Sequence, residues 1–200
     1  ARGDLDAAHE KFLEGLEISR QLAQELGTPE SLRDVSVSLD KLGNIDRARG
    51  DLDAAHEKFL EGLEIRRQLA QELGTPESLR DVSVSLDQLG NIDVTRGDLG
   101  AAQAKFLEGL EIDRQLAQEL GTPQSLRDVS VSLERLGNID RARGDLDAAH
   151  EKFLEGLEIR RQLAQELGTP ESLRDVSVSL EKLGNIDEAR GDLDAAQAKF

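Results

Sequence analysis

The sequence predicts an all-α protein in which copies of one helical hairpin stack into a solenoid. The string Arg-Gly-Asp-Leu recurs every 47 residues, and a fixed period of this length is typical of repeat architectures. Within each copy, apolar residues recur at steps of three and four, as they do on one face of a helix. Each copy contains a Gly-Thr-Pro string and a Gly-Asp string, which are typical of places where one helix ends and the next begins.

The period divides the chain into four units and a truncated fifth. Because neighbouring units are nearly identical, each should contact the next in the same way, and repetition of one contact generates a solenoid. We therefore expect residues 1–200 to form a single domain without linkers. The units comprise residues 2–48, 49–95, 96–142 and 143–189, followed by 190–200.

The second unit illustrates the first helix of the hairpin, helix A. Thr75 is a suitable N-cap, and Pro76 is suited to the first helical position. Residues 82–86 alternate as in a strand, but the alternation is short and has no hairpin partner, so we favour the helix. The apolar stripe expected to face the core is Val82, Leu86, Leu89 and Ile92.

The second helix of the hairpin, helix B, should follow directly. Gly50 is placed to end helix A, and Asp51 is placed to cap helix B through its carboxylate. Helix B should run from Leu52 to about Leu73 and end at Gly74. Two helices of about 20 residues joined by such short turns pack antiparallel. Its inward residues should be Leu52, Ala55, Phe59, Leu63 and either Leu69 or Ala70.

Composition narrows the classes of function. Acidic residues outnumber basic ones 41 to 25, for a net charge of −16, which repels nucleic acid and anionic membranes and favours basic partners. The apolar runs are far shorter than the ~20 residues of a membrane span, and no leader opens the sequence, so we expect a cytoplasmic protein. Cysteine, Trp, Tyr and Met are absent. Binding should therefore depend on polar and charged groups.

Several motifs suggest chemistry that we do not expect. The Arg-Gly-Asp triplets are explained by a helix end and a cap, so we do not expect adhesion. His9, His56 and His150 occur at most one per unit, with Gln103 and Gln197 at the equivalent places, and one imidazole beside exposed carboxylates is a poor metal site. No serine has a neighbouring base, and no phosphate-binding loop is present. We predict no enzyme, no catalytic residue, no metal and no cofactor.

The repeat resembles the tetratricopeptide repeat family along the whole chain. The 47-residue unit is similar to the long variants of kinesin light chain and of bacterial arrays, although Asp46 stands where the family usually has an aromatic residue, and no proline closes helix B. The resemblance implies a right-handed α-α superhelix whose concave side, lined by A helices, grips peptides or proteins. The residues that carry it are Leu39, Leu42, Gly43, Ile45, Gly50, Ala55 and Phe59.

Asparagine recurs in helix A of every unit, although it is a poor helix former. The resemblance implies that such asparagines face the groove, where one amide both donates to and accepts from a ligand backbone. Two alternatives remain: the amides satisfy a neighbouring helix, or duplication copied them passively. The four residues are Asn44, Asn91, Asn138 and Asn185.

Residues one turn on either side of these asparagines differ between otherwise copied units. A groove that selects a partner would vary at such positions, and so would any exposed position free to drift. The candidate partner-binding residues are Asp40, Lys41, Arg47, Asp87, Gln88, Glu134, Arg135, Arg141, Glu181 and Lys182, with Val94 and Glu188 at the remaining places.

Two functional hypotheses follow. The first is a scaffold that binds an extended peptide or protein of basic or mixed charge. The alternative is a structural or self-associating rod with no specific ligand. Residues 189–200 nearly duplicate residues 1–12, so the back of one molecule should fit the front of another, and head-to-tail self-association is expected.

Overall fold

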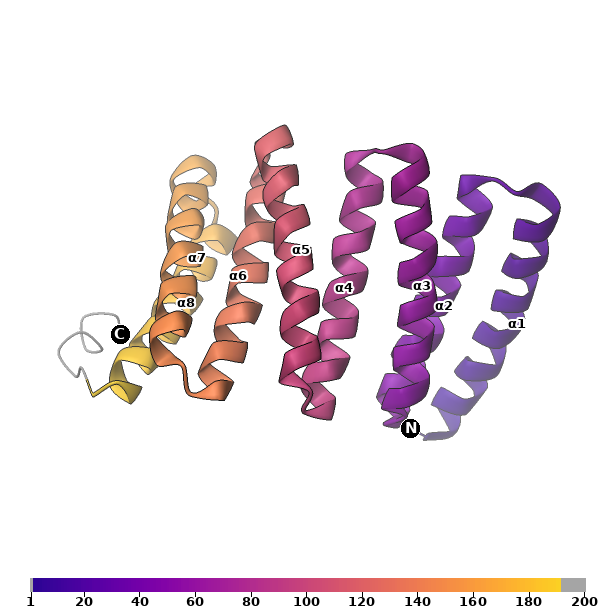
Figure 1. Cartoon of the computed structure of the whole chain (residues 1–200), viewed down its shortest axis with the longest axis horizontal. Helices are drawn as coiled ribbons and strands as arrows, with labels where there is room; N and C mark the ends of the chain where they lie inside the picture. The colour runs from indigo at the N-terminus through magenta and orange to yellow at the C-terminus, as the bar shows by residue number, and fades with distance from the viewer. Residues whose placement is uncertain (1, 192–200) are drawn as a thin grey trace. The chain divides into compact units, whose positions relative to one another are not determined.

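The computed structural model describes residues 2–191, with side chains from residue 4 onward. This range contains eight α-helices and no strand, which confirms the all-α fold of helical hairpins (Figure 1). Most of the truncated fifth unit lies outside the described residues. The helices are α1 (Arg2–Leu26), α2 (Pro29–Arg49), α3 (Leu52–Leu73), α4 (Pro76–Arg96), α5 (Leu99–Leu120), α6 (Pro123–Arg143), α7 (Leu146–Leu167) and α8 (Pro170–Ala189).

The predicted helix boundaries are confirmed by the caps. Thr75 accepts a hydrogen bond from the backbone N of Ser78 at 3.2 Å, and Ser78 Oγ accepts one from the backbone N of Thr75 at 3.2 Å. The sequence does not signal this reciprocal capping box, because the returning residue is usually Glu or Gln and here is Ser78. At the other end, Gly50 adopts the left-handed conformation with φ +85°, and the Asp51 carboxylate accepts from the Ala54 backbone N at 3.1 Å.

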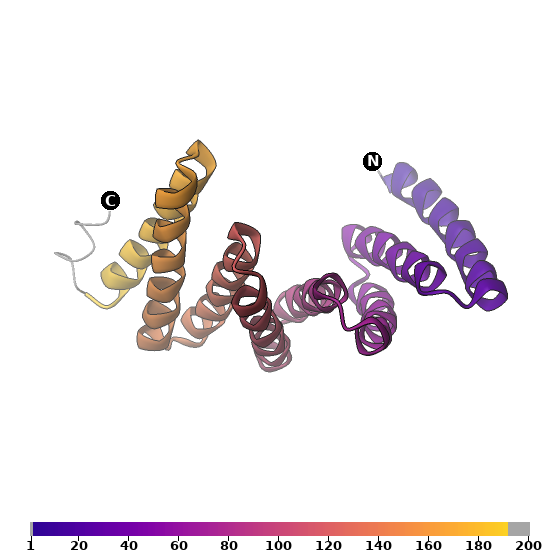
Figure 2. The same cartoon turned by 90° about the horizontal axis from the view of Figure 1, so that it is seen from above.

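The structure divides into two compact units, residues 1–105 and residues 106–200. From here on, the first and second unit are these two parts, and the 47-residue units are called repeats. In the first unit, α1 to α4 pack in sequence, each antiparallel to the next (Figure 2). In the second, α6, α7 and α8 do the same. The single continuous domain over residues 1–200 stays a prediction.

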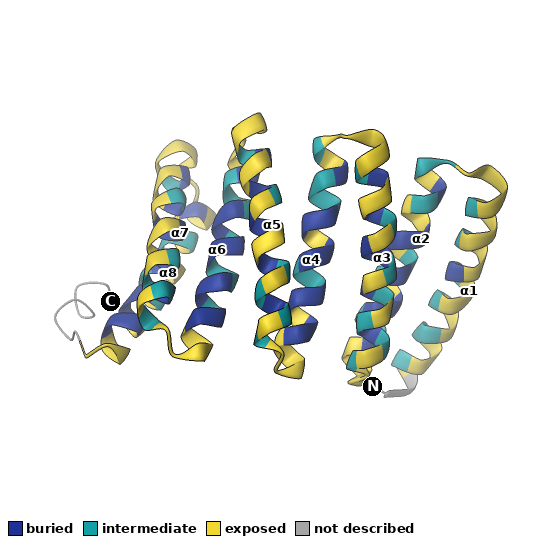
Figure 3. Cartoon of the chain, in the orientation of Figure 1, coloured by how far each residue is buried: buried dark blue, intermediate teal, exposed yellow. Residues whose placement is uncertain are grey.

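The predicted core face is confirmed. Val82, Leu86, Leu89 and Ile92 are all buried within α4, so the strand interpretation of residues 82–86 is wrong. On α3, the buried residues are Ala55, Phe59, Leu63 and Leu69, whereas Leu52 and Ala70 are only partly buried. Figure 3 shows the buried residues on the sides of the helices that face one another within each unit.

A glycine of helix A sets how closely the next hairpin packs. A Cβ at Gly43 would lie 2.8 Å from Cε1 of Phe59, and a Cβ at Gly137 would lie 2.7 Å from Cε1 of Phe153. Both rings are buried and belong to the following helix B. Glycine therefore admits the aromatic ring at each of these junctions, which any larger residue would displace.

The aspartate that replaces the family's usual aromatic residue is buried and contacts basic side chains of the flanking B helices. Asp93 lies 2.5 Å from Nζ of Lys105 on the following helix B and 3.6 Å from Nε2 of His56 on the preceding one. Asp46 lies 3.2 Å from Nε2 of His9. A buried charge is tolerated only when it is paired, so these contacts explain how an acid occupies this position.

None of the eight helices in residues 2–191 combines the length and hydropathy that a bilayer span requires.

Candidate functional site: the A-helix face

The predicted binding residues share one strip of each A helix, which we call the A-helix face. On α2 it carries Arg33, Val37, Asp40 with Lys41, and Asn44. These positions are separated by three or four residues, so they lie on one side of the helix. The strip recurs at the equivalent positions of α4 in the first unit and of α6 and α8 in the second.

The four asparagines differ in exposure. Asn91 and Asn185 are exposed. Asn44 is partly buried: its Nδ2 donates to the Asp40 backbone oxygen at 2.9 Å, and its Oδ1 accepts from Arg47 at 2.9 Å. Asn138 is partly buried, and its Oδ1 has no hydrogen-bond partner among the described residues. The side-chain amide of Asn44 is thus bonded within its own helix and not to a neighbouring helix.

Two acids of the A-helix face, Asp40 and Glu134, are held by buried arginines of the next helix B. Arg66 donates to the Asp40 carboxylate and, at 2.6 Å, to Ser85 Oγ on the following A helix. In the second unit, Arg160 donates to Glu134 at 2.7 Å and to Ser179 at 2.7 Å. Each arginine therefore ties two neighbouring A helices together from beneath the face.

These arginines were missed by sequence reasoning. Their position is occupied by Ser19, Arg66, Asp113 and Arg160 in successive 47-residue repeats, and this variation on helix B is the signal that marks them. That variation was available in the sequence, because few other positions of helix B differ between repeats.

Glu134 on α6 contacts cations of two other helices. Burial raises the pKa of Glu134, but hydrogen bonds from Lys182 and Arg160 outweigh that effect and hold the pKa below its ordinary value. Lys182 Nζ lies 2.9 Å from the Glu134 carboxylate and joins α8 to α6.

The cations of the face are anchored on core aromatic rings. Lys41 lies 6.0 Å from the centre of the Phe12 ring, and Lys182 lies 5.9 Å from that of Phe153. Arg135 stands 5.9 Å from the ring centre of Phe106. A cation over an aromatic face is attracted by the ring's quadrupole. Gln88 replaces the cation in α4, and its Oε1 is buried without a partner among the described residues.

The remaining predicted residues lie mostly at the surface. Asp87 is partly buried, and the exposed residues are Arg47, Arg141, Glu181, Val94 and Glu188.

The A-helix face also exposes valine, which sequence reasoning missed. Val37, Val84 and Val178 are 40%, 47% and 38% exposed. The Val-Ser-Val-Ser string was interpreted only through its first valine, which is buried. An apolar residue therefore lies in the middle of this face, beside its polar and charged groups, and the dependence of binding on polar and charged groups stays a prediction.

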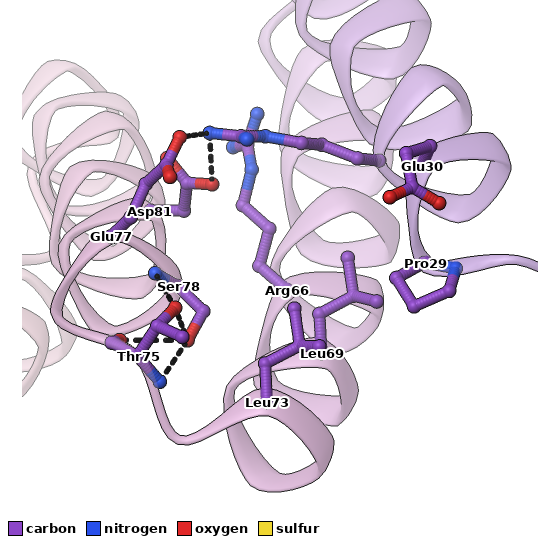
Figure 4. Close-up of a pocket in the computed structure, with 10 residues that line it drawn as sticks. Pro29, Glu30, Arg66, Leu69, Leu73, Thr75, Glu77, Ser78 and Asp81 are labelled. Atoms are coloured by element: carbon purple, nitrogen blue, oxygen red, sulfur yellow. Dashed lines mark hydrogen bonds and ion pairs between the residues drawn. The ribbon is translucent and has the colours of Figure 1, made fainter.

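A pocket opens at the amino-terminal end of the face in the first unit (Figure 4). Its volume is about 90 Å³. Arg33 crosses from α2 to α4, where it lies 2.7 Å from Glu77 and 3.0 Å from Asp81. The hydrogen bond to Glu77 and the charge of Asp81 raise the pKa of Arg33. The lining residues are Pro29, Glu30, Arg33, Arg66, Leu69, Leu73, Thr75, Glu77, Ser78 and Asp81.

Metal-binding side chains do not cluster in the part of the chain that the structure describes: no group of three or more His, Asp or Glu could hold an ion there.

Comparison with known proteins gives one family and several similar folds. The sequence profile of the tetratricopeptide repeat matches residues 35–72, from the middle of α2 to the end of α3. Because the other repeats nearly copy this stretch, the same repeat extends along the chain. No curated protein matches the chain.

Three solved structures are similar over nearly the whole chain. A putative kinesin light chain from Podosopora anserina with nearly identical tetratricopeptide-like repeats has a TM-score of 0.61 at 18% identity, covering 96% of this chain and 92% of that one. BtubC (BKLC) from P. vanneervenii has a TM-score of 0.55 at 18% identity, covering 98% and 87%. The apo form of RapI has a TM-score of 0.69 at 13% identity, covering 95% of this chain and 47% of RapI. At these identities the similarity shows the fold alone.

Proposed function

Because this chain belongs to the tetratricopeptide repeat family, we propose that it is a protein–protein interaction scaffold whose A helices hold an extended segment of a partner. The fold is typical of such scaffolds, and we assign it no catalytic step. The observation that carries the proposal is the A-helix face itself, which presents exposed amides and exposed valines between anchored charges.

Each part of the face has a distinct role in the proposal. The asparagines of the face bond the backbone of the partner, because an amide both donates and accepts. The valines contact apolar side chains. The charged residues select the partner, and Asp40 and Glu134 do so from positions fixed by buried arginines. The proposed charged and polar contacts are Asn44, Asn91, Asn138, Asn185, Asp40, Lys41, Arg47, Asp87, Gln88, Glu134, Arg135, Arg141, Glu181 and Lys182.

The partner should be basic or of mixed charge. The chain carries a net charge of −16, which attracts cationic segments and raises their rate of association.

The test replaces two asparagines of the A-helix face by alanine. The control variant replaces two glutamines outside this face. We expect Asn91→Ala with Asn138→Ala to weaken capture of a basic peptide, selected from a fluorescent peptide library, by roughly tenfold, as for two lost hydrogen bonds. Gln68→Ala with Gln162→Ala is the control, because each glutamine lies exposed on helix B and bonds only a glutamate one turn later. Unchanged capture by the asparagine variant, or its unfolding, would contradict the proposal.

Self-association is a second candidate function, favoured by the exposed side of α1 (Figure 3). Leu22 is 44% exposed, whereas its counterparts Leu69, Leu116 and Leu163 are at most 4% exposed. The neighbouring Ile18 is exposed, whereas its counterpart Ile65 packs against the core of α2. An A helix of a second copy would cover this side in the same way, giving a head-to-tail contact that does not close.

Light scattering at rising protein concentration tests this candidate. We expect a mass above that of the monomer, and Leu22→Glu should return the protein to the monomer because it places a charge in the contact. Removal of residues 190–200 should strengthen association, because this partial repeat nearly duplicates residues 2–12 and would compete with a second copy for the same contact. A monomer at every concentration for both the intact and the shortened chain would refute self-association and leave the scaffold proposal standing.

A further inference from the structure

We propose that the pocket between α2, α3 and α4 binds an alkyl chain that ends in a cation, as a lysine side chain of the partner does. The inference rests on the proposed scaffold function, since the lysine belongs to a segment held by the A-helix face. It goes beyond that function by naming one side chain and the place where it inserts.

The floor of the pocket suits an alkyl chain. Leu69 and Leu73 of α3 and Pro29 of α2 supply its apolar surface, and Leu73 is 46% exposed. A volume of about 90 Å³ holds several waters at roughly 10–15 Å³ each. Displacement of such waters from leucine by methylene groups is favourable, and long cationic side chains bury their stems in this manner while the charged end stays polar.

The rim of the pocket suits a cation. Figure 4 shows Glu30 on one side and Glu77 and Asp81 on the other, with Leu69 and Leu73 between them. Glu77 and Asp81 share the single charge of Arg33. Within residues 2–191, the side chain of Glu30 makes no hydrogen bond or ion pair. The rim therefore has more negative than positive charge, and Glu30 is the acid available to an incoming ammonium group.

Two arginines also line the pocket, yet they do not make it an anion site. Arg33 already holds two acids, and Arg66 is paired with Asp40. An anion would meet three carboxylates at close range and would have to displace one of them. Nε of Arg66 is buried without a hydrogen-bond partner among the described residues, which would favour an anionic ligand, so the test includes an anionic probe.

The second unit contains a natural comparison for this pocket. Each of the ten lining residues has an equivalent position 94 residues further along the chain. Nine of these ten positions carry the same amino acid. The difference is Gln124 in place of Glu30. Gln124 is neutral, and its Nε2 donates to the Asp128 carboxylate at 2.7 Å. The ion pairs that Arg33 makes in the first unit have equivalents here, because Arg127 lies 3.2 Å from Glu171 and 3.3 Å from Asp175. The charge of one residue is therefore what distinguishes the two places.

The experiment uses three small probes of equal length on the full chain: n-pentylammonium, n-pentanol and n-pentanoate, followed by saturation-transfer NMR titration. We expect n-pentylammonium to bind most tightly. Glu30→Gln should weaken it by roughly fivefold, as for one partly exposed charge pair. Gln124→Glu added to Glu30→Gln should restore binding, because it rebuilds the same residue set in the second unit. Circular dichroism checks that both variants fold, as expected for exposed positions.

Three results would overturn the inference. They are equal binding of n-pentanol and n-pentylammonium, tighter binding of n-pentanoate, and n-pentylammonium binding that Glu30→Gln leaves unchanged. The scaffold proposal is tested separately, because Asn91→Ala with Asn138→Ala should weaken peptide capture while leaving n-pentylammonium binding intact.

Discussion

The packing of Phe59 against Gly43 allows a sharp test of how neighbouring hairpins meet. We consider the change Gly43→Ala. In a helix interior, alanine is favoured over glycine by about 1 kcal/mol. At Gly43 the new Cβ would lie 2.8 Å from Cε1 of Phe59, and that ring is fully buried. Overpacking a close-packed core costs about 1–3 kcal/mol. The overpacking term wins, so we expect a net loss of stability of about 1 kcal/mol.

Gly15→Ala is the matched control. Gly15 also lies inside a helix, but a Cβ there would meet nothing within 4 Å. We expect this change to stabilise the protein by about 1 kcal/mol through helix propensity alone. Urea unfolding followed by circular dichroism measures both variants, and the two should differ by about 2 kcal/mol.

Gly137→Ala probes the same contact in the second unit and should behave as Gly43→Ala does. Shrinking the ring by Phe59→Leu should relieve part of the strain, so that the two changes at one junction are not additive. If Gly43→Ala stabilised the protein as much as Gly15→Ala, the account of tight ring-on-glycine packing would be refuted.

Three further predictions concern charges. Arg66→Met should destabilise the first unit by about 2–3 kcal/mol in urea unfolding, because it leaves Asp40 without its buried partner. Adding Asp40→Asn should recover part of this loss. If the effects of the two substitutions on stability were fully additive, the pairing of Arg66 with Asp40 would be contradicted. The pKa of Glu134 is lower in the folded protein than its ordinary value, so its contribution to stability is present above about pH 4.3 and is lost as pH falls through the folded pKa. Glu134→Gln should therefore flatten the fall in unfolding free energy on acidification, and an unchanged slope would contradict this assignment. Capture of a basic peptide should fade between low and high ionic strength, because exposed charges are screened beyond about 8 Å in 0.15 M salt; capture of acidic peptides to the same extent would contradict the role of the net charge.

Local signals in the sequence predicted the helices well. Thr75 with Pro76, Gly50 and Asp51 act through their own backbone geometry and near neighbours, so their roles are readable without tertiary information. The apolar stripe of α4 was readable for the same reason, because helical periodicity alone places Val82 and Leu86 on one face.

Contacts between helices were less accessible. Arg66 is buried only because Asp40 and Ser85, on two different helices, converge on it, and a sequence gives no distance across helices. The sequence marks Gly43 only through its resemblance to the family, whereas the structure shows that the Phe59 ring packs against it. The pocket beside Glu30 depends on how far apart α2 and α4 lie, which no periodicity encodes.

The central claim is that a partner lies on the A-helix face and not on the outward side of helix B. Photo-crosslinking compares them at two positions of similar exposure: Val84 on the A-helix face, 47% exposed, and Leu60 on helix B, 40% exposed. Each is replaced in turn by benzoylphenylalanine, and the protein is irradiated with the captured basic peptide. We expect a crosslinked product at position 84 and none at position 60; crosslinking at position 60 alone would contradict binding on the A-helix face.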